Sequence, residues 1–345
     1  MRQIALFIFV VIGSLSAFAQ SAPPKSDSEE KTRDAGLLLV TPSYEQAVIN
    51  KFNSVASTSK FKGSREHPDS VKTQLKSIAD QIKNAAPQSY AAQFLNYQVE
   101  GKSEKGFQYL DQAYLLNPSP DLFDDKLAEA VIRKNQAQIT EFVNKIDQKP
   151  LFNKAVIVYN RNALNSVEQN GILITYGYED TYPIIVLQQK EKLRTDVKIV
   201  CIDWLKNENY YLEVKELLHL KSKSYINELT FIEEALTKSN PNVYLSLTLP
   251  PYLIKSKLKE LYCTGLALKY SKSKFNNIEI LKENFDTKFD KTPLFQADKI
   301  NRNYLLPLGV LEKYYEAQGL NVELERIRGI LLRQNINKTP QSIVH

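Results

Sequence analysis

The chain has 345 residues, 43% of them hydrophobic, and a formal net charge of +6 at pH 7. This length is enough for two or three packed units, and the composition is that of a globular protein. Nucleic-acid binding requires a dense basic patch with interleaved aromatic residues, so we expect no nucleic-acid partner. The lysines are instead dispersed, and several alternate with Ser and Leu as on a solvated surface: Lys221, Lys223, Lys255, Lys257 and Lys259.

Residues 1–20 have the pattern of a secretory signal peptide. Arg2 precedes an apolar run, and the segment ends in the small-x-small sequence Ala17-Phe18-Ala19. A retained membrane anchor is the alternative, but the apolar run is short for a bilayer span. Residues 21–35 are polar and contain proline, which predicts a disordered linker. We therefore expect an exported protein, periplasmic or envelope-associated, with no transmembrane segment in the mature chain.

The two cysteines, Cys201 and Cys263, both lie in apolar segments. This placement favours two buried thiols. An oxidising compartment would also permit a disulfide, so the pairing stays open at this point.

Residues 36–150 show helical spacing of apolar residues and predict a helical-hairpin domain. The run from Tyr109 to Pro120, YLDQAYLLNPSP, resembles the second helix of a tetratricopeptide (TPR) repeat, with Ala113 in the packed position. Stacks of such hairpins usually present a binding face. The expected helices are Tyr44–Ser54, Val71–Ala85, Ser89–Val99, Lys105–Leu116, Asp121–Lys134 and Gln136–Ile146.

Residues 151–270 predict an α/β domain. After a helix within Leu151–Ser166, a strand at Ile172–Ile174, a helix at Ile184–Lys192 that begins after Pro183, and a strand at Val197–Ile202 form a βαβ unit. Further strands are expected at Val243–Leu249 and Leu266–Tyr270, and a helix or lid at Tyr252–Tyr262. The expected fold class is α/β, with a small, mostly parallel Rossmann-like sheet flanked by TPR-like helical hairpins.

Residues 271–345 are expected to contain an irregular segment over Ser271–Gln296 and a C-terminal helical hairpin. The two helices of this hairpin span Ile300–Gln318 and Asn321–Gln334. Pro307 should kink or divide the first of them, because proline interrupts the helical hydrogen-bond pattern.

The run Gly177-Tyr178-Glu179-Asp180-Thr181-Tyr182-Pro183, followed by Arg194-Thr195-Asp196-Val197-Lys198, resembles a known family. It is similar to the soluble carboxy-terminal region of bacterial protein O-mannosyltransferase-like membrane proteins, whose pattern is Gly-Asp-Asn-Asp-Thr-Phe-Pro and then Arg-Thr-Asp-Val-Arg. The resemblance covers roughly residues 155–330. Tyr178 and Glu179 depart from the pattern. The resemblance implies a fold and an envelope setting. It does not imply transferase activity for this chain, because the membrane portion of that family, where a glycosyl transfer site would lie, is expected to be absent here.

Ligands of open parallel sheets bind beyond the carboxyl ends of the strands, so residues after the predicted strands are the site candidates. Glu179, Asp180 and Asp203 are the candidate catalytic carboxylates. For Glu179 and Asp180 the favoured interpretation is that Asp180 caps the next helix and Glu179 is solvated, whereas Asp203 is equally suited to capping a turn. Arg194 and Asp196 are expected to form a structural ion pair. The candidate binding residues are Tyr178, Tyr182, Trp204 and Thr248, although a lone tryptophan is more often a core residue.

No histidine, cysteine and carboxylate cluster with zinc spacing occurs, and no glycine-rich phosphate loop, so we expect no metal and no cofactor. The first functional hypothesis is a non-enzymatic binding or scaffold module for an envelope partner protein. The alternative is an envelope glycan hydrolase or transferase that uses the strand-end carboxylates. A sugar-binding module that uses Trp204 is a third hypothesis.

Overall fold

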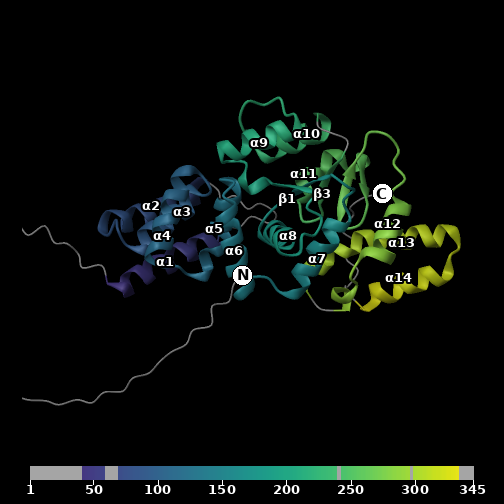
Figure 1. The fold of residues 1–345 in the computed structure, drawn as a ribbon, viewed down its shortest axis with the longest axis horizontal. Helices are drawn as coiled ribbons and strands as arrows, with labels where there is room; N and C mark the ends of the chain where they lie inside the picture. Colours follow the sequence, from purple (N-terminus) through teal and green to yellow (C-terminus); the bar gives the residue numbers. More distant parts are fainter. Residues whose placement is uncertain (1–40, 59–68, 239–241, 296–297, 334–345) are drawn as a thin grey trace, which may run out of the picture. The chain divides into compact units, whose positions relative to one another are not determined.

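The computed structural model describes residues 41–58, 69–238, 242–295 and 298–333 (Figure 1). The expected signal peptide at 1–20 and linker at 21–35 lie outside these residues. Within the described ranges, no helix combines the length and the apolar character that a bilayer span needs.

Six helices form the first part of the described chain. Serine and asparagine side chains begin three of them: Ser89, Ser103 and Asn135 each accept a hydrogen bond from a backbone N–H of the first turn. Neighbouring helices pack as hairpins, α3 against α4 and α5 against α6. The predicted helices in this region are confirmed, with these bounds: α1 (Pro42–Thr58), α2 (Asp69–Ala85), α3 (Tyr90–Glu100), α4 (Glu104–Leu116), α5 (Phe123–Ile132) and α6 (Gln136–Gln148).

One five-stranded sheet forms the centre of the α/β region, in the order β2-β1-β3-β5-β4. Strands β2, β1 and β3 run parallel, while β5 is antiparallel to both of its neighbours. Four strands therefore point in one direction and one in the other. Their bounds are β1 (Ile172–Thr175), β2 (Lys198–Cys201), β3 (Val243–Ser246), β4 (Leu261–Cys263) and β5 (Ala267–Tyr270).

Helices cover the sheet, and β1 is buried along its whole length, as a central parallel strand should be. On one face, Leu173 and Tyr244 pack with Leu164 of α7 (Lys154–Asn165) and Ile184 of α8 (Tyr178–Glu191). The main apolar core includes Ile174 and extends from Tyr97 to Ile327, so it joins the helical and α/β regions. The remaining helices are α9 (Glu208–Leu218), α10 (Glu228–Lys238), α11 (Pro251–Ile254), α12 (Ile278–Glu283), α13 (Leu305–Gln318) and α14 (Asn321–Arg333).

Three expectations about elements need correction. Helix α8 begins at Tyr178, six residues before the predicted start, so Pro183 lies inside its first two turns. The segment Tyr252–Tyr262 is not one helix, because its last residues pair with β5 as strand β4. Helix α12 and a π-helical turn at Asn284–Lys288 lie in the segment expected to be irregular. Pro307 follows a 3₁₀ turn and sits in the first turn of α13, so it divides the segment as predicted.

Candidate functional site

Asp180 lies at the carboxyl end of β1, in the first turn of α8, and is only 2% exposed. Its Oδ2 accepts a hydrogen bond from the backbone N–H of Tyr176 at 2.8 Å. The same oxygen accepts a short hydrogen bond from the hydroxyl of Thr248, which follows β3. Gly177 makes this tight strand-to-helix turn possible with a φ of 108°. Asp180 therefore joins the ends of β1 and β3 and satisfies a backbone donor beside the helix start.

Hydroxyl groups extend this network beneath α8. The Thr175 and Thr181 hydroxyls lie 2.8 Å apart, and Thr181 Oγ1 lies 3.4 Å from the Cys201 sulfur. The Thr248 and Ser246 hydroxyls also pair, at 2.8 Å. Burial raises the pKa of the Cys201 thiol to about 12, with a further contribution from Asp203. The thiol is therefore a protonated packing group rather than a nucleophile.

Glu179 and Asp180 do not converge on one point. Glu179 is exposed while Asp180 is buried, as expected for adjacent residues of a helix. The backbone carbonyl of Glu179 accepts a hydrogen bond from Asn160 of α7 at 2.7 Å. Asp203 is also exposed and lies in a 3₁₀ turn, Ile202–Trp204, directly after β2. Of the three candidate carboxylates, only Asp180 is buried.

A fourth carboxylate, Glu228, lies near the carboxyl end of β1, and the sequence analysis did not identify it. It is the first residue of α10. The hydroxyl of Tyr176 donates to its Oε1 at 2.8 Å, and the hydroxyl of Tyr252 donates to its Oε2 at 2.5 Å. Burial, followed by the Glu228 carboxylate, raises the pKa of Tyr176 well above its usual range. Glu228 thereby fastens α10 and α11 to the end of β1.

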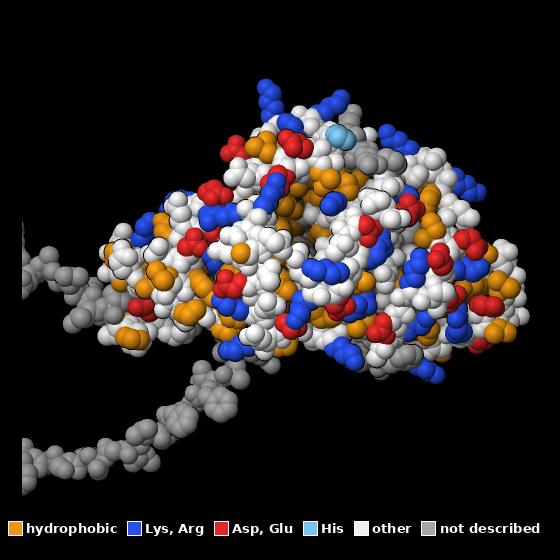
Figure 2. Space-filling view, viewed as in Figure 1, with side chains coloured by type: hydrophobic (Ala, Val, Ile, Leu, Met, Phe, Trp, Pro, Cys, Tyr) orange, Lys and Arg blue, Asp and Glu red, His pale blue; other side chains and the backbone are white. Residues whose placement is uncertain are grey.

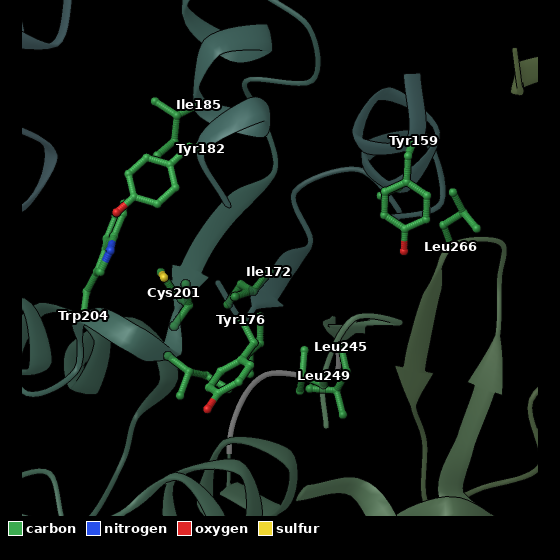
Figure 3. Close-up of a cluster of buried hydrophobic side chains, with 14 of the residues drawn as sticks. Tyr159, Ile172, Tyr176, Tyr182, Ile185, Cys201, Trp204, Leu245, Leu249 and Leu266 are labelled. Atoms are coloured by element: carbon green, nitrogen blue, oxygen red, sulfur yellow. The ribbon is translucent and has the colours of Figure 1, made fainter. Parts of the chain in front are cut away.

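The predicted binding aromatics form a chain of ring contacts instead of an open platform. Tyr178 contacts Phe152 and Tyr182, with ring centroids 4.9 and 5.5 Å apart. Trp204 lies between Tyr182 and Tyr210, at 5.7 and 5.5 Å. Figure 3 shows Trp204 beside Tyr182 in the buried cluster, apart from Tyr159 and Leu266. Trp204 is 2% exposed, so the structure places it in the core.

Arg194 and Asp196 form the expected ion pair, with two hydrogen bonds of 2.8 and 2.9 Å. Arg194 also donates to the carbonyls of Leu164, Val167 and Glu168. Those carbonyls belong to the end of α7 and the turn after it. The pair therefore ties the segment before β2 to the segment before β1, at the edge opposite the candidate site.

The structure shows a cavity of ≈ 10 Å³ near the start of α10, which is the space of about one water molecule. Tyr211, Tyr225, Phe231 and Glu234 are among its lining residues, and none of the candidate carboxylates is. Within the described ranges, no group of three or more His, Cys, Asp or Glu side chains is arranged to hold a metal ion.

The structure defines a mixed α/β protein with helical hairpins. A network of hydrogen bonds joins the carboxyl ends of its strands β1 and β3. Residues 157–293 match the family model described as TMEM260-associated domain 2, which is less than half of the 345-residue chain. The TMEM260 family is protein O-mannosyltransferase-like. The matched range contains all five strands, Asp180 and Glu228. Comparisons with curated proteins and with solved structures each gave no match.

Proposed function

We propose that the chain is an exported cell-envelope protein that acts as a binding or scaffold module for a partner protein. The observation that carries this proposal is the pair of exposed leucines at the end of α4. Leu115 is 77% exposed and Leu116 is 50% exposed. Adjacent large apolar side chains in water are typical of a protein contact site when they lie on a packed helical scaffold.

The hydrogen bonds at the carboxyl ends of β1 and β3 support the interpretation that the candidate site stabilises the fold and does not carry out catalysis. Asp180 accepts hydrogen bonds from Tyr176 and Thr248 and is buried, so its carboxylate serves the fold. A catalytic carboxylate must instead reach a substrate atom at hydrogen-bond distance. We infer that the sheet is a Rossmann-like scaffold and that the hairpins are TPR-like. The match to TMEM260-associated domain 2 supports a relation to the soluble region of bacterial O-mannosyltransferase-like proteins, and with it the envelope setting.

The test is affinity purification of the tagged chain from its own envelope, alongside Leu115→Ser/Leu116→Ser. We expect a stoichiometric protein partner with the unmodified chain and its loss with this variant. The matched control is Val322→Ser/Leu332→Ser, which changes two other apolar residues that are 82% and 77% exposed. A partner that both variants retain, or none at all, would contradict the proposal.

An envelope glycan hydrolase or transferase is the second candidate, and one observation favours it. Glu228 accepts a hydrogen bond from Tyr176, the residue directly after β1, and Asp203 is exposed directly after the neighbouring strand β2, so two carboxylates lie at the carboxyl ends of adjacent strands. Glycosidases use two carboxyl groups on opposite sides of the scissile bond. This candidate predicts that Glu228→Gln and Asp203→Asn each abolish release of sugar from isolated envelope. Unchanged release by either variant would exclude that pair.

A further inference from the structure

Three exposed apolar side chains surround the start of α10. Ile226 is 64% exposed in the loop before the helix, Leu229 is 42% exposed in its first turn, and Tyr252 of α11 is 46% exposed. The 2.5 Å hydrogen bond from Tyr252 to Glu228 holds α11 against the start of α10. Ile226 and Leu229 lie within two residues of Glu228 in the chain, so we group them with Tyr252 and name this region the α10–α11 surface.

Lysines border this surface on two sides. Residues 219–229 and 251–260 together contain five lysines and two glutamates. Both carboxylate oxygens of Glu228 accept hydrogen bonds from tyrosines, and Glu260 lies 3.9 Å from Lys257. Figure 2 shows Lys and Arg side chains along the upper edge, in the region of α9 and α10. Four of the five lysines make no ion pair within the described part of the chain: Lys221, Lys223, Lys255 and Lys259.

The loop that carries Ile226 and two of these lysines is fixed to the body of the protein. The Tyr211 hydroxyl donates to the carbonyl of Ser222 at 3.1 Å. The Ser222 hydroxyl donates to Glu234 of α10 at 2.8 Å, and Tyr225 packs on Tyr211 with ring centroids 6.2 Å apart. Because Tyr225 is anchored inward, the neighbouring Ile226 is presented to solvent in a defined position.

We propose that the α10–α11 surface docks onto an anionic lipid bilayer. Ile226, Leu229 and Tyr252 enter the headgroup region, where apolar side chains and the amphipathic tyrosine ring are both favoured. The surrounding lysines contact lipid phosphates and are attracted by the negative surface potential. Exposed apolar side chains with lysines nearby can enter the headgroup region of a lipid bilayer, which adapts to their shape. A helical peptide partner would instead require a groove with pockets for its apolar side chains. This inference does not rest on the proposed protein-binding function.

The first test is sedimentation of the purified chain with vesicles of phosphatidylcholine alone or with about one third phosphatidylglycerol. We expect binding to the anionic vesicles only, and loss at high salt because charges are screened. Lys221→Glu/Lys223→Glu/Lys255→Glu should weaken that binding at least about tenfold. The matched control, Lys51→Glu/Lys149→Glu/Lys313→Glu, changes the net charge equally at other exposed lysines and should bind like the unmodified chain.

All forms are purified as the mature chain without residues 1–20, the expected signal peptide, so this apolar segment contributes to the binding of none of them. Equal binding by the two triple variants, or binding to neutral vesicles as strong as to anionic ones, would overturn the proposal. So would a chain that sediments with neither kind of vesicle. If the variant Lys221→Glu/Lys223→Glu/Lys255→Glu binds vesicles like the unmodified chain but loses an acidic protein partner, the α10–α11 surface binds that partner and not lipid.

The second test reports insertion directly. Ile226→Cys is labelled with a polarity-sensitive fluorophore, while the two native cysteines are 0% and 5% exposed and stay unlabelled in the folded chain. We expect the emission at position 226 to shift to the blue with anionic vesicles. Val322→Cys, at an apolar residue of α14 that is 82% exposed, is the matched control and should show no shift. A shift at both positions, or at neither, would contradict the docking geometry.

Discussion

Asp196 gives the chain a defined dependence of stability on pH. The hydrogen bond from Arg194, with a smaller contribution from the backbone N–H of Asn170, lowers the pKa of Asp196 from 3.8 to about 2. Because the pKa is depressed in the folded state, the stabilisation is present above about pH 4 and is lost as the pH falls through about 2.

We therefore expect Asp196→Asn to reduce the free energy of unfolding by about 1 kcal/mol at pH 7, since the pair is partly exposed and screened. Urea unfolding at pH 7, 5 and 3 measures this effect. The difference from the unmodified chain should shrink toward the lowest pH. A difference that stays constant over the whole series would mean that the charge of Asp196 is not the stabilising feature.

Asp180 should contribute to stability through its buried hydrogen bonds. Asp180→Ala leaves the Tyr176 N–H and the Thr248 hydroxyl without this acceptor, so we expect a loss of about 1–3 kcal/mol in the free energy of unfolding. Glu179→Ala changes the exposed neighbour and should cost less than about 0.5 kcal/mol. Chemical denaturation of both variants provides the comparison, and equal losses would argue against the role of Asp180 at the strand ends.

The same two residues show what sequence reasoning can reach. The helix-capping alternative for Asp180 and the solvated state of Glu179 follow from local spacing, because strand, glycine and helix are adjacent in the chain. The bonds of Glu228 to Tyr176 and Tyr252 join residues 52 and 24 positions away. No local pattern marks such contacts, since they arise only when α10 and α11 pack over the sheet edge.

At the scale of elements, Gly106 is required by the α3–α4 hairpin. A Cβ at Gly106 would lie 1.8 Å from the carbonyl oxygen of Gly101, whereas a Cβ at Gly309 in α13 would meet no atom within 4 Å. We expect Gly106→Ala to destabilise the chain by several kcal/mol, or to prevent folding. Gly309→Ala should stabilise it by about 0.5–1 kcal/mol through helix propensity. Thermal unfolding of the two variants tests this contrast, and shifts of the same sign would contradict it.

Element boundaries were predicted well where caps are local and poorly where tertiary packing decides them. The N-cap serines of α3 and α4 are visible in the sequence, and those helices begin within a residue of the expected position. Helix α8 begins earlier than predicted because Gly177 turns the chain with a positive φ. The prediction had placed the helix start at Pro183, since proline is common in the first turn of a helix. Strand β4 has three residues, and pairing with β5 defines it more than its own composition does.

At the scale of the molecule, a polar junction connects the hairpins to the sheet. Lys102, between α3 and α4, pairs with Asp125 of α5 at 3.0 Å. The side chain of Asn207, which caps α9, donates to the carbonyl of Lys102 at 3.0 Å and accepts from the backbone N–H of Tyr210. Together with the continuous apolar core, these bonds predict that α4 to α6 and the sheet unfold as one cooperative unit.

This cooperativity is measurable, because Trp204 is the only tryptophan. We expect urea transitions followed by tryptophan fluorescence and by far-ultraviolet circular dichroism to share one midpoint, apart from the helical signal of α1 and α2, whose apolar side chains form a second cluster with the start of α3. Asn207→Ala should lower both midpoints together. Two well-separated transitions of comparable helical amplitude would show that the residues before and after 150 fold independently.

Both cysteines are expected to be buried thiols throughout the native protein. Cys201 and Cys263 are free in the structure, and burial raises the pKa of each to about 12. A thiol reagent at pH 8 should therefore react with neither in the folded chain and with both after denaturation without reductant. No reaction after denaturation would reveal a disulfide.

The two outer strands of the sheet also bear on self-association. Strands β2 and β4 each have one neighbour, and they are four and three residues long. Lys198 begins β2 and is exposed there. Because β2 and β4 are short, each exposes few backbone N–H and C=O groups that a strand of another molecule could pair with. Pairing along β2 would also remove water from the charged Lys198 side chain. The sheet therefore has little capacity to grow into the ordered aggregates that longer, apolar edges nucleate.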